Sequence, residues 1–261
     1  MKNLLLFALT LAISCTSPAP TETATEPDAP EPAYLPSLQA AFDAHGKLEN
    51  WKKYKTLTFT RRSGESQENH TIDLENRKVR ISSEDYELGF DGQDVWVSPD
   101  KDAYSGRSAR FFHNLWFYFF SIPHILSDPG VNASDMEDVV FNGKNYKRIM
   151  ITFGDNVGDA PDDKYLLYLS EDNRLDFINY SVTYYDPSRT NNFNALVYED
   201  WQEVDGLLVP GTMKGYRWEN DTIGDQRYEV QVSEIAFSAE KADQAIFEVP
   251  EGAYVDVKES D

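Results

Sequence analysis

Hydrophobic and polar side chains alternate through most of the chain after residue 56, and this period of two constrains the fold more than any other feature. Short alternating runs such as Leu57–Thr60 and Lys78–Ile81 are separated by polar turns. The dipeptides Asn142-Gly143 and Asp205-Gly206 are typical of tight hairpins, because both central residues of such turns need a positive φ. The sequence therefore predicts a mainly β (α+β) fold built on a long antiparallel meander.

About ten strands are expected. They cover residues 57–60, 71–74, 78–81, 86–90, 95–97, 148–153, 165–169, 175–185, 193–201, 213–218 and 227–237. A sheet of that length must curl or close, since a twisted open sheet does not stay flat over so many strands. An N-terminal helix should precede the sheet, with Ser37 as its N-cap and Gly46 at its end.

One later segment breaks the β pattern. Residues 111–122 are rich in aromatic side chains and contain neither glycine nor proline, and Pro123 follows them. On a helical projection the apolar residues cover most of the circumference, and His113 and His124 fall on the narrow polar stripe that remains. A helix that is apolar nearly all round is buried on several sides or lies in an apolar cavity.

The N-terminus has the parts of a secretory signal. Lys2 precedes an apolar run over residues 4–13, and this run is shorter than the ~20 residues that a membrane-spanning helix needs. The segment Leu11–Cys15 resembles a bacterial lipobox, although Ala12 stands where the usual pattern has Leu. We therefore expect residues 1–14 to be a signal peptide and Cys15, the only cysteine, to become the acylated first residue of the mature chain.

Residues 15–36 are dominated by proline, threonine and glutamate, a composition that cannot bury enough apolar surface to fold. We expect this segment to be a disordered linker, followed by one domain over residues 37–257 and a short tail over 258–261. Loss of Lys2 with the signal changes the formal net charge from −21 to −22. Such an acidic chain is repelled by phosphate backbones, so nucleic acid is excluded as a partner, and the acyl anchor must supply the membrane affinity.

Two motifs resemble those of a known family. The hairpin Phe90–Asp100, with Asp91-Gly92 and Trp96, and the closing segment Ala245–Ala253 are similar to segments of the outer-membrane lipoprotein carriers of the LolA and LolB type. Trp51-Lys52-Lys53 and the loop 154–159 also resemble a group of uncharacterised Bacteroidota lipoproteins. The resemblance implies a curved antiparallel half-barrel, whose open mouth is covered by helices and whose apolar cavity holds acyl chains.

Under this resemblance, residues 111–126 would supply the aromatic helical lid. The candidate cavity and lid residues are Trp96, Phe111, Phe112, Leu115, Trp116, Phe119, Phe120 and Ile122. The lid is more aromatic than expected of a carrier that opens for a lipid. The alternative is that its rings fill the interior and leave a packed core without a ligand.

Enzyme signatures are missing from the sequence, including the nucleophile elbow, the phosphate-binding glycine loops and the zinc-binding His-Glu-x-x-His. No cofactor is predicted. His113 and His124 are the only candidates for a catalytic base or ligand on the polar stripe, and satisfied core histidines would give the same pattern. A metal is not predicted either, although oxygen ligands for calcium are close together in one loop, at Asp155, Asp159, Asp162 and Asp163. An exposed hairpin tip would have the same composition.

Three functions remain open. The first is a lipid-anchored envelope protein that binds an acyl chain, a lipid or a lipoprotein segment in an apolar cavity. The second is a structural or protein-interaction lipoprotein with a filled core, and the third is a hydrolase that uses His113 or His124. The expected location is the outer membrane, with the domain facing the periplasm, and the sequence sets no oligomeric state.

Overall fold

Thirteen strands form one antiparallel, open sheet in the computed structural model, which describes residues 34–155 and 157–256. The strands of this sheet are β1 (Thr56–Ser63), β2 (Ser66–Asp73), β3 (Val79–Ser82), β4 (Glu87–Phe90), β5 (Val95–Ser98), β6 (Val131–Phe141), β7 (Lys144–Phe153), β8 (Tyr165–Leu169), β9 (Leu175–Tyr180), β10 (Asn194–Glu199), β13 (Thr212–Glu219), β14 (Thr222–Ser238) and β15 (Tyr254–Asp256). A separate hairpin consists of β11 (Gln202–Val204) and β12 (Leu207–Val209). The predicted mainly β fold is confirmed.

The helices are short. They are α1 (Pro36–Ala44), α2 (Leu48–Trp51), α3 (Ala109–Phe112) and α4 (Leu115–Ser121), with the 3₁₀ turns η1 (Lys101–Ala103), η2 (His124–Ser127), η3 (Pro187–Arg189) and η4 (Gln244–Phe247). Within the described part of the chain, no helix has the length and apolarity that crossing a bilayer requires.

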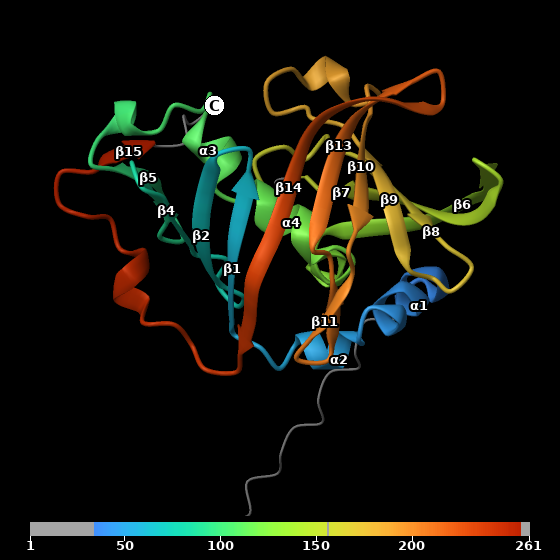
Figure 1. The fold of residues 1–261 in the computed structure, drawn as a ribbon, viewed down its shortest axis with the longest axis horizontal. Helices are drawn as coiled ribbons and strands as arrows, with labels where there is room; N and C mark the ends of the chain where they lie inside the picture. Colours follow the sequence, from blue (N-terminus) through green and yellow to red (C-terminus); the bar gives the residue numbers. More distant parts are fainter. Residues whose placement is uncertain (1–33, 156, 257–261) are drawn as a thin grey trace, which may run out of the picture. The chain divides into compact units, whose positions relative to one another are not determined.

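The sheet order is β15-β5-β4-β3-β2-β1-β14-β13-β10-β9-β8-β7-β6, so β14 lies in the middle and β15 and β6 form the edges (Figure 1). Register shifts interrupt the pairing of β14 with both β1 and β13, and such bulges increase the local twist of a sheet. The predicted hairpin turns are confirmed, because Asn142-Gly143 and Asp205-Gly206 all have positive φ.

Curvature brings distant strands to one helix. Phe120 of α4 stacks on Phe59 of β1 at 5.1 Å between ring centroids, and Phe119 meets Tyr180 of β9 at 4.8 Å. These two strands are four places apart in the sheet, which is about 19 Å in a flat sheet at ~4.8 Å per strand. The sheet therefore curves around α4, which lies behind β14 in the view of Figure 1.

Two details of the helices differ from the sequence prediction. Leu35, not Ser37, precedes the first turn of α1, because Pro36 occupies a first-turn position that needs no amide donor. The Ser37 hydroxyl donates instead to Asp135 at 2.5 Å. The expected single helix over residues 111–122 is broken at His113 and Asn114 into α3 and α4. Tyr34, the first described residue, packs edge-on against the ring of Phe42.

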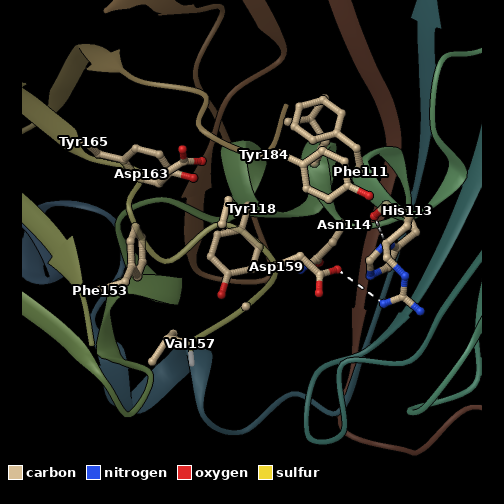
Figure 2. Close-up of a pocket in the computed structure, with 14 residues that line it drawn as sticks. Phe111, His113, Asn114, Tyr118, Phe153, Val157, Asp159, Asp163, Tyr165 and Tyr184 are labelled. Carbon is tan, nitrogen blue, oxygen red and sulfur yellow. Dashed lines mark hydrogen bonds and ion pairs between the residues drawn. The ribbon is translucent and has the colours of Figure 1, made fainter. Parts of the chain in front are cut away.

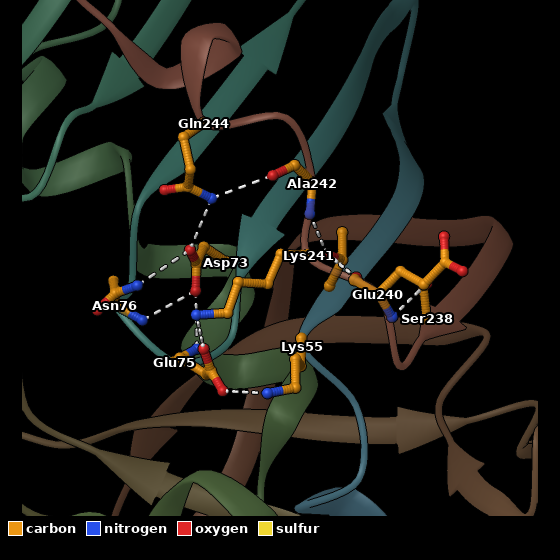
Figure 3. Close-up of polar contacts among 10 residues, drawn as sticks. Lys55, Asp73, Glu75, Asn76, Ser238, Glu240, Lys241, Ala242 and Gln244 are labelled. Atoms are coloured by element: carbon orange, nitrogen blue, oxygen red, sulfur yellow. Dashed lines mark hydrogen bonds and ion pairs between the residues drawn. The ribbon is translucent and has the colours of Figure 1, made fainter.

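Residues 239–253, here called the strap, join β14 to β15 at the edge of the sheet. Figure 3 shows Glu75 between Lys55 and Lys241. The two ion pairs measure 2.7 Å to Lys55 and 2.5 Å to Lys241. Gln244 donates to Asp73 at 3.1 Å, and the amide of Ala242 donates to the Thr56 hydroxyl at 2.9 Å. These bonds fix the strap to β1 and to the turn after β2.

The strap also determines the environment of Trp96. Its indole N–H donates to the carbonyl of Phe247 at 3.2 Å, and its ring leaves no room for a side chain at Gly89. Val95 and Val97, its neighbours on β5, belong to the main core, whereas Trp96 does not. Trp96 is therefore a packing residue beneath the strap, not a cavity residue.

Candidate functional site

The helical segment of residues 109–127, comprising α3, α4 and η2, fills the concave side of the sheet. Four of the predicted cavity residues are buried there in the main core, with exposures of 6% or less: Trp116, Phe119, Phe120 and Ile122. The rings of Phe119 and Phe120 pack against β9 and β1, from the two halves of the sheet. Most of the space that a carrier would offer to a ligand is occupied by the protein's own side chains.

Two arginines contact this helical segment, Arg61 from β1 and Arg77 from the turn between β2 and β3. The guanidinium of Arg61 lies 4.5 Å from the ring centroid of Trp116, and that of Arg77 lies 5.6 Å from the ring of Phe117. Arg77 also forms an ion pair with Asp128 at 2.6 Å. A cation–π contact contributes about 0.5–1 kcal/mol at an exposed site and about 2 kcal/mol when it is desolvated. The contact of the buried Arg61 should therefore stabilise the position of α4 more than that of the partly exposed Arg77.

Arg61 belongs to a buried polar network. Glu68 accepts a hydrogen bond from Arg61 at 3.0 Å, lies 3.2 Å from the ring nitrogen of His70, and accepts from the hydroxyl of Tyr86 at 2.9 Å. Burial alone would raise the pKa of Glu68, but His70 and the charge of Arg61 hold it below its usual value. Burial also lowers the pKa of His70. The network thus keeps an ionised carboxylate behind the helical segment.

A pocket of about 130 Å³ remains beside this segment, between α3, α4 and the loop that follows β7. Figure 2 shows Phe111 and Tyr184 on one side of it and Phe153 and Val157 on the other. The lining residues are Arg110, Phe111, His113, Asn114, Leu115, Tyr118, Phe153, Val157, Gly158, Asp159, Ala160, Asp163, Tyr165 and Tyr184. Of the predicted cavity residues, Phe111 and Leu115 line this pocket.

Phe112 points elsewhere. Its ring lies 5.4 Å from that of Tyr104 and 5.7 Å from the guanidinium of Arg61, and it is not part of the pocket lining. The sequence prediction missed Phe153, Val157 and Tyr165, which come from β7, the following loop and β8. The alternation of β7 indicated that Phe153 lies in a strand, but only the curvature of the sheet brings this strand end to α4.

Two charged residues that line the pocket, Arg110 and Asp163, are hydrogen-bonded within the protein. Arg110 donates to Asp159 at 3.4 Å and to the carbonyl of Asp256 at 2.9 Å. Asp163 accepts from the amide and the hydroxyl of Thr183 at 2.6 and 2.7 Å, while burial raises the pKa of its carboxyl group. These contacts support the loop that forms the outer wall of the pocket.

The calcium alternative receives no support from this geometry. Across residues 34–155 and 157–256, no group of three or more His, Cys, Asp or Glu side chains is arranged to hold a metal ion. Asp159 and Asp163 are engaged with Arg110 and Thr183, and Asp155 and Asp162 are exposed. The four carboxylates of the loop are therefore not gathered around one point.

The two histidines of the predicted polar stripe have different surroundings. His113 lines the pocket, and its Nδ1 is 2.5 Å from the carbonyl of Arg110. His124 stacks on Trp51 at 5.2 Å and on Phe42 at 6.3 Å. Burial lowers the pKa of His113 to about 4 and that of His124 to about 3, so both are neutral at pH 7. They do not form a joint site.

Unpartnered polar atoms are concentrated in the helical segment. Eight buried side-chain atoms of the described residues have no hydrogen-bond partner, and five of them belong to residues 109–127. These five are Arg110 Nε, Asn114 Oδ1, Trp116 Nε1, Ser121 Oγ and His124 Nε2. Each such atom costs about 1–3 kcal/mol of desolvation. The segment thus combines extensive ring packing with most of the unpartnered side-chain atoms of the described residues.

The fold and the site together define a class of protein: an open, curved antiparallel sheet wrapped around an aromatic helical segment, with a pocket at its side. No family model and no curated protein sequence matches the chain. Solved structures with a similar arrangement include a LolA superfamily protein from Nitrosomonas europaea, with a TM-score of 0.48 and 10% identity over 80% of this chain and 97% of that one. A DUF1329 family protein from Desulfovibrio piger has a TM-score of 0.48 and 11% identity over 82% of this chain and 98% of that one.

A putative outer membrane lipoprotein-sorting protein domain from Vibrio parahaemolyticus is also similar, with a TM-score of 0.38 and 13% identity over 80% of this chain and 95% of that one. The fold class of this chain rests on its own strand order, and its function must be argued from its own site. The predicted acylation site Cys15, the signal peptide and most of the linker lie outside the described residues.

Proposed function

We propose that this protein is a non-enzymatic, lipid-anchored envelope protein of the lipoprotein-carrier type, which binds an apolar group of a lipid or lipoprotein. The pocket beside α4 is the binding site. One observation carries the proposal: a mostly apolar, solvent-accessible pocket of about 130 Å³ remains at the side of an otherwise filled concave sheet. Anchoring through Cys15, on the outer membrane and facing the periplasm, is part of the same proposal.

The lining of the pocket suits an aliphatic chain. Phe111, Leu115, Phe153 and Val157 provide apolar contacts, and Tyr118 adds a ring at the same wall. Burial of apolar surface contributes about 25 cal/mol per Å², so a few methylene groups supply several kcal/mol without a charged partner. The present pocket holds one end of a chain.

A longer chain requires the helical segment to move. The five unpartnered polar atoms of residues 109–127 favour such a movement, because each of them would gain water when the segment leaves the sheet. The cation–π contacts of Arg61 and Arg77 oppose it. Binding of a full acyl chain is thus a balance between ring packing and the hydration of these groups.

The proposal is tested by titrating the full chain with a fluorescent fatty acid. Ala160 lines the pocket, and Ala160→Trp would fill it with an indole ring. Ala245 lies in η4 with an exposed side chain, so Ala245→Trp adds the same ring away from the pocket. We expect saturable binding that Ala160→Trp lowers at least tenfold and Ala245→Trp leaves unchanged. No saturable binding, or equal binding by both variants, would contradict the proposal.

A second function is favoured by the filled interior. With Trp116, Phe119 and Phe120 packed into the core, the protein can act as an interaction module that needs no lipid. This alternative predicts that the chain purified from its native envelope carries no extractable lipid and instead copurifies with a stoichiometric protein partner. Mass spectrometry of both fractions separates the two functions.

A further inference from the structure

The strand β6 leaves a long edge of the sheet open. It covers eleven residues, and among the strands that the structure describes it pairs with β7 alone, so it ends the sheet order (Figure 1). An edge strand keeps a row of backbone N–H and C=O groups with which a further strand can pair. The opposite edge strand, β15, has only three residues, and Arg110 donates to the carbonyl of Asp256 in it at 2.9 Å. The edge that can accept a strand is therefore that of β6.

β6 also carries exposed apolar side chains. Met136 and Val140 are the large hydrophobic residues that stay exposed in the described part of the chain, with 41% and 68% of their surfaces accessible. Single exposed apolar residues are common on proteins, but both of these lie on one edge strand. A strand added beside β6 would bring its own side chains to within ~4.5–5.5 Å of its cross-strand neighbours on β6. These contacts favour an extended segment as the partner.

Three carboxylates give this edge a negative charge. Asp135, Glu137 and Asp138 are exposed, and within residues 34–155 and 157–256 none of them forms an ion pair. Two cations of the neighbouring strand β7 have other partners. Lys147 donates to a side chain of the turn between β8 and β9 at 3.1 Å, and Arg148 donates to the backbone carbonyl of Glu137 at 2.8 Å. The charge along this edge is therefore available to a partner.

Charge decides which segment fits the edge. A second copy of the chain is disfavoured, because two β6 strands would bring acidic side chains together and each copy has a formal net charge of −21. Residues 15–33 of the same chain contain five prolines but no lysine or arginine, so they lack both the complementary charge and several amide donors. Acidic residues on an edge strand protect it against such pairings. A basic segment is the partner that this protection does not exclude.

We propose that β6 binds an extended, basic segment of a partner protein, which adds to the sheet as a further strand. Its backbone pairs along Val131–Met136, which is bound to β7 without a register shift and is as long as an ordinary strand. Its lysine or arginine side chains lie near Asp135, Glu137 and Asp138. This inference goes beyond lipid binding and does not depend on it.

The test uses a short peptide of alternating lysine and valine with blocked ends and a fluorescent label. The peptide is titrated into the full chain, and binding is followed by fluorescence anisotropy. One control peptide has glutamate in place of lysine, and another keeps the lysines but has N-methyl groups on all backbone amides. We expect saturable binding of the first peptide alone, and weaker binding at high salt because exposed charges are screened.

Two double variants locate the binding. Glu137→Gln/Asp138→Asn removes two exposed charge contacts and should lower the affinity by about three- to tenfold. Glu84→Gln/Asp85→Asn makes the same change in an exposed pair between β3 and β4, and it should leave the affinity unchanged. Hydrogen exchange of the bound complex should slow at the amides of β6 and stay the same at those of β15.

The outcomes are decisive for this inference alone. Equal binding of the N-methylated peptide would show charge attraction without strand addition, and equal losses in both double variants would place the peptide elsewhere; either result overturns the inference. Absence of saturable binding, or slowed exchange only outside β6, does the same. Sedimentation of the full chain should show no dimer, since a dimer that protects β6 would assign this edge to a second copy. The fatty acid titration is independent of all these results.

Discussion

Replacement of Ser121 by alanine should make the protein more stable. Ser121 ends α4 with 2% of its surface exposed, and its hydroxyl oxygen has no hydrogen-bond partner. An unsatisfied buried hydroxyl costs about 1–3 kcal/mol, and removal of the oxygen also loses a few packing contacts. We therefore expect Ser121→Ala to raise the free energy of unfolding by about 1 kcal/mol.

Ser181 provides the matched control. It is fully buried, with 0% exposure, but its hydroxyl oxygen accepts the amide of Lys164 at 2.8 Å. Ser181→Ala leaves that amide without a partner and should lower the free energy of unfolding by about 1–2 kcal/mol. The same chemical change is thus expected to act with opposite signs at the two sites.

Urea unfolding followed by circular dichroism measures both effects. The slope of the free energy against urea should stay the same in the wild type and both variants, because the surface exposed on unfolding is unchanged. A urea midpoint of Ser121→Ala at or below that of the wild type would show that the Ser121 hydroxyl does not destabilise the folded protein, and would refute this prediction.

Three further predictions follow from other sites. Burial lowers the pKa of His124 to about 3, whereas the pKa of a histidine in the unfolded chain is about 6.5. As the pH falls, the unfolded state therefore binds a proton before the folded state does. The free energy of unfolding decreases as the pH falls from 6.5 toward 3. His124→Phe, which keeps the ring between Phe42 and Trp51, should therefore lose about 2 kcal/mol less than the wild type between pH 7 and pH 5 in urea unfolding; equal losses would contradict this. Gly89→Ala would place a Cβ atom 2.3 Å from the ring of Trp96 and should destabilise the protein by about 1–3 kcal/mol. Gly224→Ala, whose new Cβ atom has its nearest contact at 3.5 Å, should be close to neutral. Equal thermal midpoints of the two variants would refute the packing role of Trp96. Cys15→Ser should move the protein from the membrane fraction to the soluble fraction, and an unacylated cysteine in the wild-type N-terminal peptide, seen by mass spectrometry, would rule out the anchor.

The sheet could be predicted because alternation survives in most of its strands. β6 was missed, since Asp135, Glu137 and Asp138 break the apolar period of an edge strand that is mostly exposed. The three residues of β15 were also missed, because so short an edge strand forms only when the strap brings it to β5. Local periodicity contains no information on the long-range pairing of β15 with β5, whereas β6 pairs with β7 through the local Asn142-Gly143 turn.

The site was only partly predictable for the same reason. The apolar character of residues 111–122 indicated a buried segment, and it is buried. The helix is broken at His113 and Asn114, and this break decides which side chains enter the core. Phe111 and Leu115 line the pocket, whereas Phe119 and Phe120 lie in the core. A helical projection of an unbroken helix cannot show this.

Photo-crosslinking with a diazirine fatty acid tests the central claim most directly. The full chain is illuminated with the bound probe, digested, and the labelled residues are located by mass spectrometry. We expect labels on the apolar wall of the pocket beside α4, namely on Phe111, Leu115, Phe153 and Val157, and their loss in Ala160→Trp. Labels confined to other surfaces, or labels that persist at these residues in Ala160→Trp, would contradict it.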